Sequence, residues 1–154
     1  MKPNPEAMKA KLARARSAVD KGITYKLGKG GVFPGAKLPC NPFKQCDCSG
    51  FVAWVLGISR VPKPSRRWWI ETTNIYRDAI GPQTVFARIP EPVPGCVVVF
   101  PDRDGHEGHV GIVSQSYPLR VVDCGSPGIT ERGGGYFERN HAIYCVLAQD
   151  MTRD

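Results

Sequence analysis

Two residues in this sequence have the type and the setting needed for nucleophilic catalysis. Cys48 lies where a loop rich in glycine and proline gives way to an apolar stretch with helical spacing. The positive end of a helix dipole favours a thiolate at such a position. His109 begins the apolar segment HVGIVSQS, which is typical of a strand, and its imidazole could accept the thiol proton. The pair predicts a cysteine hydrolase.

Asp123 is the best candidate for orienting that imidazole. A catalytic histidine usually needs an acceptor at its second ring nitrogen. Asp123 ends the segment RVVD, and a hairpin would bring this segment beside the strand of His109. Two alternatives stay open, because Asp123 could form the turn before Gly125 and Cys48 could be a small buried residue.

Helices are expected in the first half of the chain. Apolar side chains recur there at three- and four-residue steps, and the expected helices cover residues 6–20, 48–58 and 66–79. Asp47 stands at the N-cap position of the second helix, and Ser65 at that of the third. A long loop over 26–47, rich in glycine and proline, is expected to shape one wall of a cleft.

Strands are expected in the second half. Short apolar runs bounded by turn residues predict strands over 96–100, 110–113, 119–124 and 142–148. An arginine and three glycines over 132–135 predict a flexible loop between the last two strands. Helices followed by mainly antiparallel strands indicate the α+β class.

The charge of the chain points to an anionic partner. Its net charge is +7 and its isoelectric point is near 9.3, values that favour nucleic acid, anionic membrane or an acidic cell-wall polymer. Nucleic acid is not expected, because no helix-turn-helix or RNA-reading motif is present. No stretch approaches the roughly 20 apolar residues that span a bilayer. The basic N-terminus has no apolar centre, so we expect synthesis in the cytoplasm without a secretory signal.

The six cysteines do not predict a metal site. Cys40, Cys46 and Cys48 are separated by five and one intervening residues, whereas a zinc site needs repeated C-x2-C spacing or matched histidines. We therefore expect no metal and no cofactor.

Several motifs resemble those of a known family. The segments DCSGFV, residues 47–52, and GHVGIV, residues 108–113, resemble the signature of the NlpC-type cell-wall peptidases, a papain-like superfamily. Tyr25 resembles the tyrosine that lies upstream of the nucleophile in this family, and PVPGCVVVF resembles the lead-in to the first core strand. The resemblance covers about residues 20–125.

The resemblance implies a fold and a set of roles. The fold would be papain-like, with N-terminal helices packed on a small, mainly antiparallel sheet in a single cysteine hydrolase domain over residues 1–154. Cys48 would be the nucleophile and His109 the general base. Tyr25 would line the site and assist the oxyanion, while Asp47 and Ser49 would hold the amino end of a peptidoglycan stem peptide. The reaction would be amide hydrolysis through a thioester, without a metal.

The sequence departs from the family pattern in two places. Members often have a histidine in the orienting position, where this chain offers Asp123. Cys46 and Cys124 are expected near the site, so a disulfide or a different nucleophile stays open, as does the state of Cys40. The strand end at Cys124 also resembles that of small secreted amidase toxins of the same superfamily.

The expected function is therefore peptidoglycan hydrolysis at an amide of the stem peptide. A phage endolysin or tail-associated endopeptidase, acting on the bacterial cell wall after release or delivery, is the first expectation. An injected antibacterial amidase effector and a catalytically silent wall-binding module are the alternatives. The stem peptide is the expected partner; the sequence leaves the oligomeric state open, with a monomer as the default.

A few other residues have two interpretations. Trp68 and Trp69 could stack on sugar rings but are expected in the core. Arg66, Arg67 and Arg132 could bind carboxylates of the stem peptide or could be surface charges.

Overall fold

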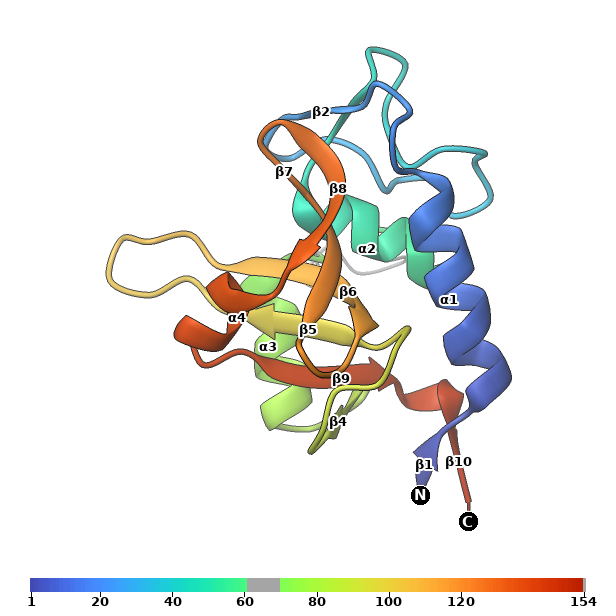
Figure 1. Cartoon of the computed structure of the whole chain (residues 1–154), viewed down its shortest axis with the longest axis vertical. Helices are drawn as coiled ribbons and strands as arrows, with labels where there is room; N and C mark the ends of the chain where they lie inside the picture. The colour runs from blue at the N-terminus through green and yellow to red at the C-terminus, as the bar shows by residue number, and fades with distance from the viewer. Residues whose placement is uncertain (61–69, 154) are drawn as a thin grey trace.

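An antiparallel six-stranded sheet forms the centre of the protein. The computed structural model describes residues 1–60 and 70–153. The strands lie in the order β4-β9-β5-β6-β7-β8, and each pairs antiparallel with its neighbours (Figure 1). Their bounds are β4 Phe86–Ile89, β5 Val97–Phe100, β6 His109–Gln115, β7 Arg120–Gly125, β8 Gly128–Gly133 and β9 Ile143–Leu147.

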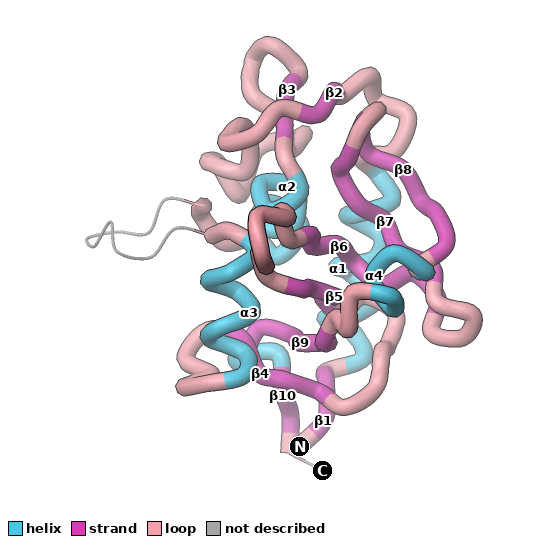
Figure 2. Tube along the Cα trace, turned by 90° about the vertical axis from the view of Figure 1, so that its left-hand side faces the viewer, coloured by secondary structure: helices cyan, strands magenta, loops and turns pink. Residues whose placement is uncertain are grey.

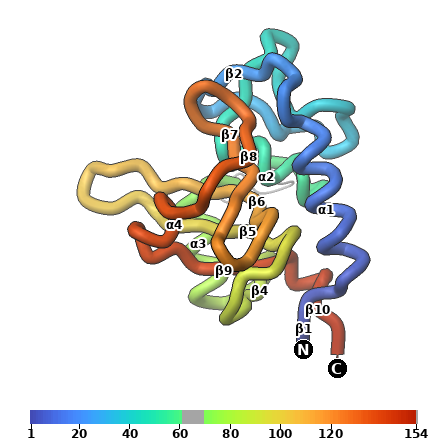
Figure 3. The backbone as a smooth tube through the Cα atoms, in the orientation of Figure 1, coloured from blue at the N-terminus to red at the C-terminus, as the bar shows by residue number. Residues whose placement is uncertain are grey.

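Helices and two short strand pairs surround this sheet. The helices are α1 Pro5–Ser17, α2 Cys48–Leu56, α3 Thr72–Ile80 and the short α4 Gly135–Arg139, with a 3-10 turn at Ala148–Asp150. β1 (Lys2–Pro3) pairs with β10 (Met151–Thr152), so the two ends of the chain lie side by side (Figure 3). β2 (Thr24–Tyr25) pairs in parallel with β3 (Gln45–Cys46), beyond the first turn of α2 (Figure 2).

Both faces of the sheet are buried, and β5 shows how. Val97 and Val99 join a cluster of apolar residues from α2, α3 and the sheet. Val98 and Phe100 join a second cluster on the opposite face, which includes Phe137 of α4. Side chains alternate between the faces of a strand, so a strand that is covered on both sides is apolar at every position. This explains the uninterrupted run VVVF.

The helix that begins at Cys48 is buried all around. Every residue of α2 is buried, because the helix lies between α1 on one side and β6 and β7 on the other. Asp47 caps its start by accepting a hydrogen bond from Gly50 N, and Gly57 ends it in the left-handed conformation with φ 73°. A helix that is apolar on all faces belongs in a core, and the sequence CSGFVAWVL has that character.

The long loop before α2 approaches the helix closely at Gly31. A Cβ atom at this position would lie 2.3 Å from the carbonyl oxygen of Gly50. Gly31 also has a φ of 74°, in the left-handed region that favours glycine. The loop can therefore lie directly against the first turn of α2.

The structure confirms the mixed helix and sheet composition that the sequence predicted. The first two helices, the N-cap at Asp47 and the four expected strands lie within a few residues of their predicted bounds. None of the helices in the described ranges is both long and apolar enough to cross a membrane.

The third helix begins later than predicted. It starts at Thr72 with Glu71 as its N-cap, whereas the prediction began at 66. Ile70 is not helical, because its amide donates to the carbonyl of Arg60 and its own carbonyl accepts from the Arg60 side chain. The predicted N-cap Ser65 lies outside the described residues.

Two strands of the six-stranded sheet were missed in the sequence. β4 was assigned to no element, and the predicted loop over 132–135 is wrong, since Arg132 and Gly133 belong to β8 and Gly135 begins α4. The segment GITERG has no alternating apolar pattern because its second half is mostly exposed. It is a strand because β7 supplies a continuous antiparallel partner, from Arg120 to Gly125.

Candidate active site

Cys48 lies at the contact between α2 and the sheet. It is the first residue of α2, which packs on β6, and only 7% of it is exposed. Its thiol forms hydrogen bonds with backbone groups of Ser49, in its own helix, and Val110, on β6. Because Val110 follows His109 in the chain, the nucleophile candidate lies beside the strand that carries the histidine.

Burial dominates the electrostatics of this thiol. Burial and, to a smaller extent, the negative charge of Asp47 raise the pKa of Cys48 to about 12, although the backbone hydrogen bonds from Val110 and Ser49 oppose the shift. At neutral pH the thiol is therefore protonated in this environment. The position at a helix start does not by itself produce a thiolate, so attack by sulfur requires a neighbouring base.

His109 is held on two sides. Its Nε2 atom lies 2.6 Å from Asp123 Oδ2, and its ring stacks on Phe137 of α4 with centroids 5.3 Å apart and planes 28° apart. The ring of Tyr136 approaches it edge-on, at 6.1 Å between centroids. Since Nε2 is engaged by the carboxylate, Nδ1 is the ring nitrogen that remains for a proton donor.

Asp123 is completely buried in β7, within a strand and not in a turn. β6 and β7 form the expected antiparallel pair, which brings the aspartate beside the strand of His109. Gly111 makes room for it, because a Cβ atom at that position would lie 3.1 Å from the Cβ of Asp123. The arrangement thus depends on a small residue opposite the carboxylate.

A cleft of about 300 Å³ opens in front of Cys48. All three residues predicted to bind substrate line it, namely Tyr25, Asp47 and Ser49. Leu27 and Gly28 of the long loop contribute one wall, as expected of that loop. The remaining lining residues are Gly108, which begins the GHVGIV motif, and Arg60, Glu71, Thr72, Asp102 and Glu107, which were not identified from the sequence.

The small parallel strand pair places Tyr25 near Cys48, and both residues line the cleft. Tyr25 pairs in register with Cys46, two residues before Cys48. Burial raises the pKa of its hydroxyl, and the negative charges of Asp47 and Glu107 raise it further. The Tyr25 hydroxyl therefore stays protonated at all working pH values and can donate a hydrogen bond into the cleft.

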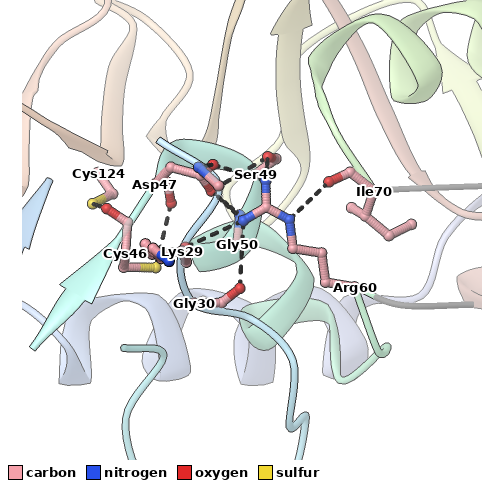
Figure 4. A network of polar contacts seen from close by, with 10 residues as sticks. Lys29, Gly30, Cys46, Asp47, Ser49, Gly50, Arg60, Ile70 and Cys124 are labelled. Carbon is pink, nitrogen blue, oxygen red and sulfur yellow. Dashed lines mark hydrogen bonds and ion pairs between the residues drawn. The ribbon is translucent and has the colours of Figure 1, made fainter. Parts of the chain in front are cut away.

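Asp47 and Arg60 form a buried ion pair at the start of α2 (Figure 4). Arg60 Nη1 lies 2.6 Å from Asp47 Oδ1 and Nη2 lies 2.8 Å from Oδ2, which is a bidentate arrangement. Nη2 also donates to Ser49 Oγ at 2.8 Å. Gly28 N donates to Asp47 Oδ2, so the carboxylate joins the cleft loop, the helix start and the segment after α2.

Other residues of the site could not be found by sequence reasoning. Arg60 follows the helix end in a segment without any charge pattern, and the aromatic pair Tyr136 and Phe137 lies in a five-residue helix. Arg132, expected to bind substrate or to be a surface charge, donates to Asp123 Oδ2 at 2.8 Å. Trp68, Trp69, Arg66 and Arg67 lie outside the described residues.

The cysteines are all free thiols in the structure. Cys124 Sγ donates to the carbonyl of Cys46, and both residues are completely buried. Of the three cysteines near the site, Cys48 is the one that lines the cleft. In the described part of the chain, no group of three or more His, Cys, Asp or Glu residues is arranged to hold a metal ion.

A thiol at a helix start thus lies beside the strand of a histidine, and a buried carboxylate contacts the ring of that histidine. The model of the CHAP domain family matches residues 39–122, more than half of the chain, and the chain belongs to this family. No curated protein gives a significant sequence match. The match includes Cys48 and His109 and ends one residue before Asp123.

The CHAP family is related to the predicted NlpC-type family but is not the same family. CHAP domains are cysteine- and histidine-dependent amidohydrolases and peptidases of cell-wall hydrolases, and they are related to the NlpC-type enzymes that the sequence motifs resemble. The protein is therefore a hydrolase of the cell-wall amidase or peptidase class.

Replacing Arg60 tests the role of the buried ion pair. Arg60→Met would leave Asp47 buried without its counter-ion, a change that costs about 3–5 kcal/mol. We expect the free energy of unfolding, measured by urea denaturation, to fall by that amount. The double variant Arg60→Met/Asp47→Asn should recover part of the loss, because the uncompensated charge is removed.

The matched control is Arg103→Met, at an arginine on the exposed loop before β6. It should change the free energy of unfolding by less than about 1 kcal/mol. Equal effects of the two methionine variants would contradict a structural role for the Asp47–Arg60 pair.

Proposed function

We propose that this protein is a peptidoglycan hydrolase that cleaves an amide bond of the stem peptide with Cys48 as nucleophile. The observation that carries the proposal is the cleft at the start of α2, in which the Cys48 thiol lies beside the strand of a histidine anchored by Asp123. The CHAP family match supports the reaction class, and the cysteine mechanism is our inference from this geometry.

The first half of the reaction forms a thioester. His109 takes the proton of the Cys48 thiol, and the sulfur attacks the carbonyl carbon of the amide. The oxyanion that forms can accept hydrogen bonds from unpaired backbone N–H groups in the first turn of α2 and from the Tyr25 hydroxyl. The imidazolium then returns its proton to the leaving amine, and the C–N bond breaks.

The second half releases the acid. Water loses a proton to His109 and attacks the thioester carbonyl. The C–S bond then breaks, the imidazolium returns its proton to the leaving sulfur, and the carboxylic acid and the free Cys48 thiol result. Asp123 orients the imidazole in both halves through its contact with Nε2. We infer a papain-like arrangement for this catalytic unit, in which the cysteine helix packs against an antiparallel sheet that carries the histidine.

The carboxylates of the cleft point to a cationic group on the substrate. Asp47 is engaged by Arg60 and two backbone amides, so we assign it to holding the helix start together with Ser49. Glu71 caps α3, and Asp102 accepts from Gly108 N. Glu107 lines the cleft without a hydrogen bond or ion pair among the described residues, and we propose that it faces an amino group of the stem peptide.

Digestion of purified peptidoglycan tests the proposed reaction. The wild-type protein should release defined fragments with new amino and carboxyl ends, identified by mass spectrometry. Cys48→Ala should release none, because no nucleophile remains in the cleft. Cys40→Ala, at a partly buried cysteine of the long loop, serves as a control and should retain activity.

Two outcomes would contradict this proposal. Fragment release by Cys48→Ala at the wild-type rate would show that Cys48 is not the nucleophile. Binding of peptidoglycan without any release by the wild-type protein would instead support a catalytically silent wall-binding module.

Substrate charge tests the proposed role of Glu107. For a stem peptide with a free amino group, Glu107→Gln should raise KM about three- to tenfold and leave kcat nearly unchanged, because a partly exposed charge pair is lost in ground state and transition state alike. For the N-acetylated peptide the variant and the wild type should have the same KM.

Asp104→Asn provides the control, because Asp104 lies in the same exposed loop but not on the cleft. An equal rise in KM for free and acetylated peptides would contradict recognition of an amino group by Glu107.

A further inference from the structure

The buried carboxylate of Asp123 has a cationic partner, Arg132, in addition to the imidazole of His109. Arg132 Nη2 lies 2.8 Å from Asp123 Oδ2, and His109 Nε2 lies 2.6 Å from the same oxygen. The Asp123 side chain is fully buried, whereas 47% of the Arg132 side chain is exposed. The arginine therefore lies between the carboxylate and solvent and shares one oxygen atom with the histidine.

The register of β7 and β8 places Arg132 for this contact. Asp123 pairs with Thr130 and Val121 pairs with Arg132, so Arg132 is the diagonal neighbour of Asp123 on the same face of the sheet. Diagonal neighbours in a sheet are within reach of long side chains. A short residue, or a shift of β8 by one position, would remove the contact.

Gly125 provides the space in which the guanidinium of Arg132 and the imidazole of His109 meet. A Cβ atom at this position would lie 3.5 Å from Arg132 Nη2 and 3.9 Å from His109 Cε1. Both groups thus approach Asp123 over the same glycine, one from β8 and one from β6. The guanidinium and the imidazole therefore act on the same carboxylate at short range.

We propose that Arg132 is a positioning residue for His109, fixing Asp123 Oδ2 toward Nε2 and limiting how strongly the carboxylate holds the imidazolium. An opposite charge stabilises the protonated imidazole. A guanidinium on the same oxygen neutralises part of that charge, so the imidazole both accepts a proton and gives it back. This role rests on the proposed function, in which His109 is the base.

The elements packed around β6 and the loop before it carry other ionisable groups. They are Asp123 and Cys124 on β7, Arg132 on β8, Cys48 on α2, Tyr136 on α4 and Glu107 in the preceding loop. Of these, Asp123 and Arg132 are the groups joined to the histidine by a direct hydrogen bond or through one shared atom. Substitution of Arg132 leaves the other groups in place.

An NMR titration of the histidines tests the proposal without any enzymatic assay. The background is Cys48→Ser, which removes the thiol, and His106 and His141 serve as internal references. In Arg132→Met the titration midpoint of His109 should rise by about 0.5–1 pH unit, because the carboxylate now faces the imidazolium alone. In Arg132→Lys, which keeps the charge, the midpoint should stay within about 0.3 unit of the parent.

Arg120→Met is the matched control. Arg120 lies on β7 and contacts the backbone of Glu131, so its loss removes the same charge from the neighbouring strand without touching Asp123. Its His109 midpoint should equal that of the parent. If Arg132→Met does not fold, Arg132→Gln makes the same change of charge, retains an N–H donor and should raise the midpoint in the same direction.

An unchanged His109 midpoint in the folded Arg132 variant would overturn the proposal and leave Arg132 as a structural cover for Asp123. The result does not depend on whether Cys48 is the nucleophile, because the titrated chain has no thiol at that position. In the active protein, the limb of the pH–rate profile that reports His109 should move to higher pH in Arg132→Met and return toward the wild-type position in Arg132→Lys.

Discussion

The start of α2 is buried, and this burial constrains everything around it. A helix N-terminus carries unpaired amide groups, which must find acceptors within the protein when water is excluded. Asp47 supplies acceptors to Gly50 N and Gly28 N, and Arg60 balances its charge. The loop before the nucleophile, the helix start and the segment leading to α3 are therefore joined at one buried ion pair, so the position of Cys48 depends on residues on both sides of it.

The same burial determines how the thiol can react. The pKa of the thiol is raised to about 12, because the effect of burial is larger than the opposing effect of the two backbone hydrogen bonds. A buried neutral thiol is inert toward a carbonyl until a base takes its proton. The role of His109 follows from this, and so does the need to orient its ring. Asp123 contacts Nε2, and Phe137 stacks on the ring. Arg132 donates a hydrogen bond to the same carboxylate oxygen of Asp123.

Some of this organisation could be predicted from the sequence, because it depends on local signals. Patterns within a few consecutive residues predict the N-cap Asp47, the apolar helix after Cys48 and the strand that begins at His109. The structure contains all three. The pairing of β6 with β7, which brings Asp123 to the histidine, followed from the expected hairpin.

The rest depends on contacts between distant segments, which leave no local pattern. Arg60 reaches Asp47 across α2, and α4 brings Phe137 to His109 from beyond β8. β8 itself is a strand because β7 offers it a partner, not because its glycines and charges favour one. The role of Arg132 was missed for the same reason, since only the strand register brings it to Asp123.

The most direct test of the central claim is the alkylation of Cys48 by iodoacetamide as a function of pH, followed peptide by peptide with mass spectrometry. At pH 7 we expect Cys48 in wild type to react at least about tenfold faster than in His109→Ala, where the buried thiol lacks its base. In that variant the rate should keep rising with pH beyond 10, because the thiolate forms only near the raised pKa. Cys40 should react equally in both proteins. Identical rates for Cys48 with and without His109 would contradict the account.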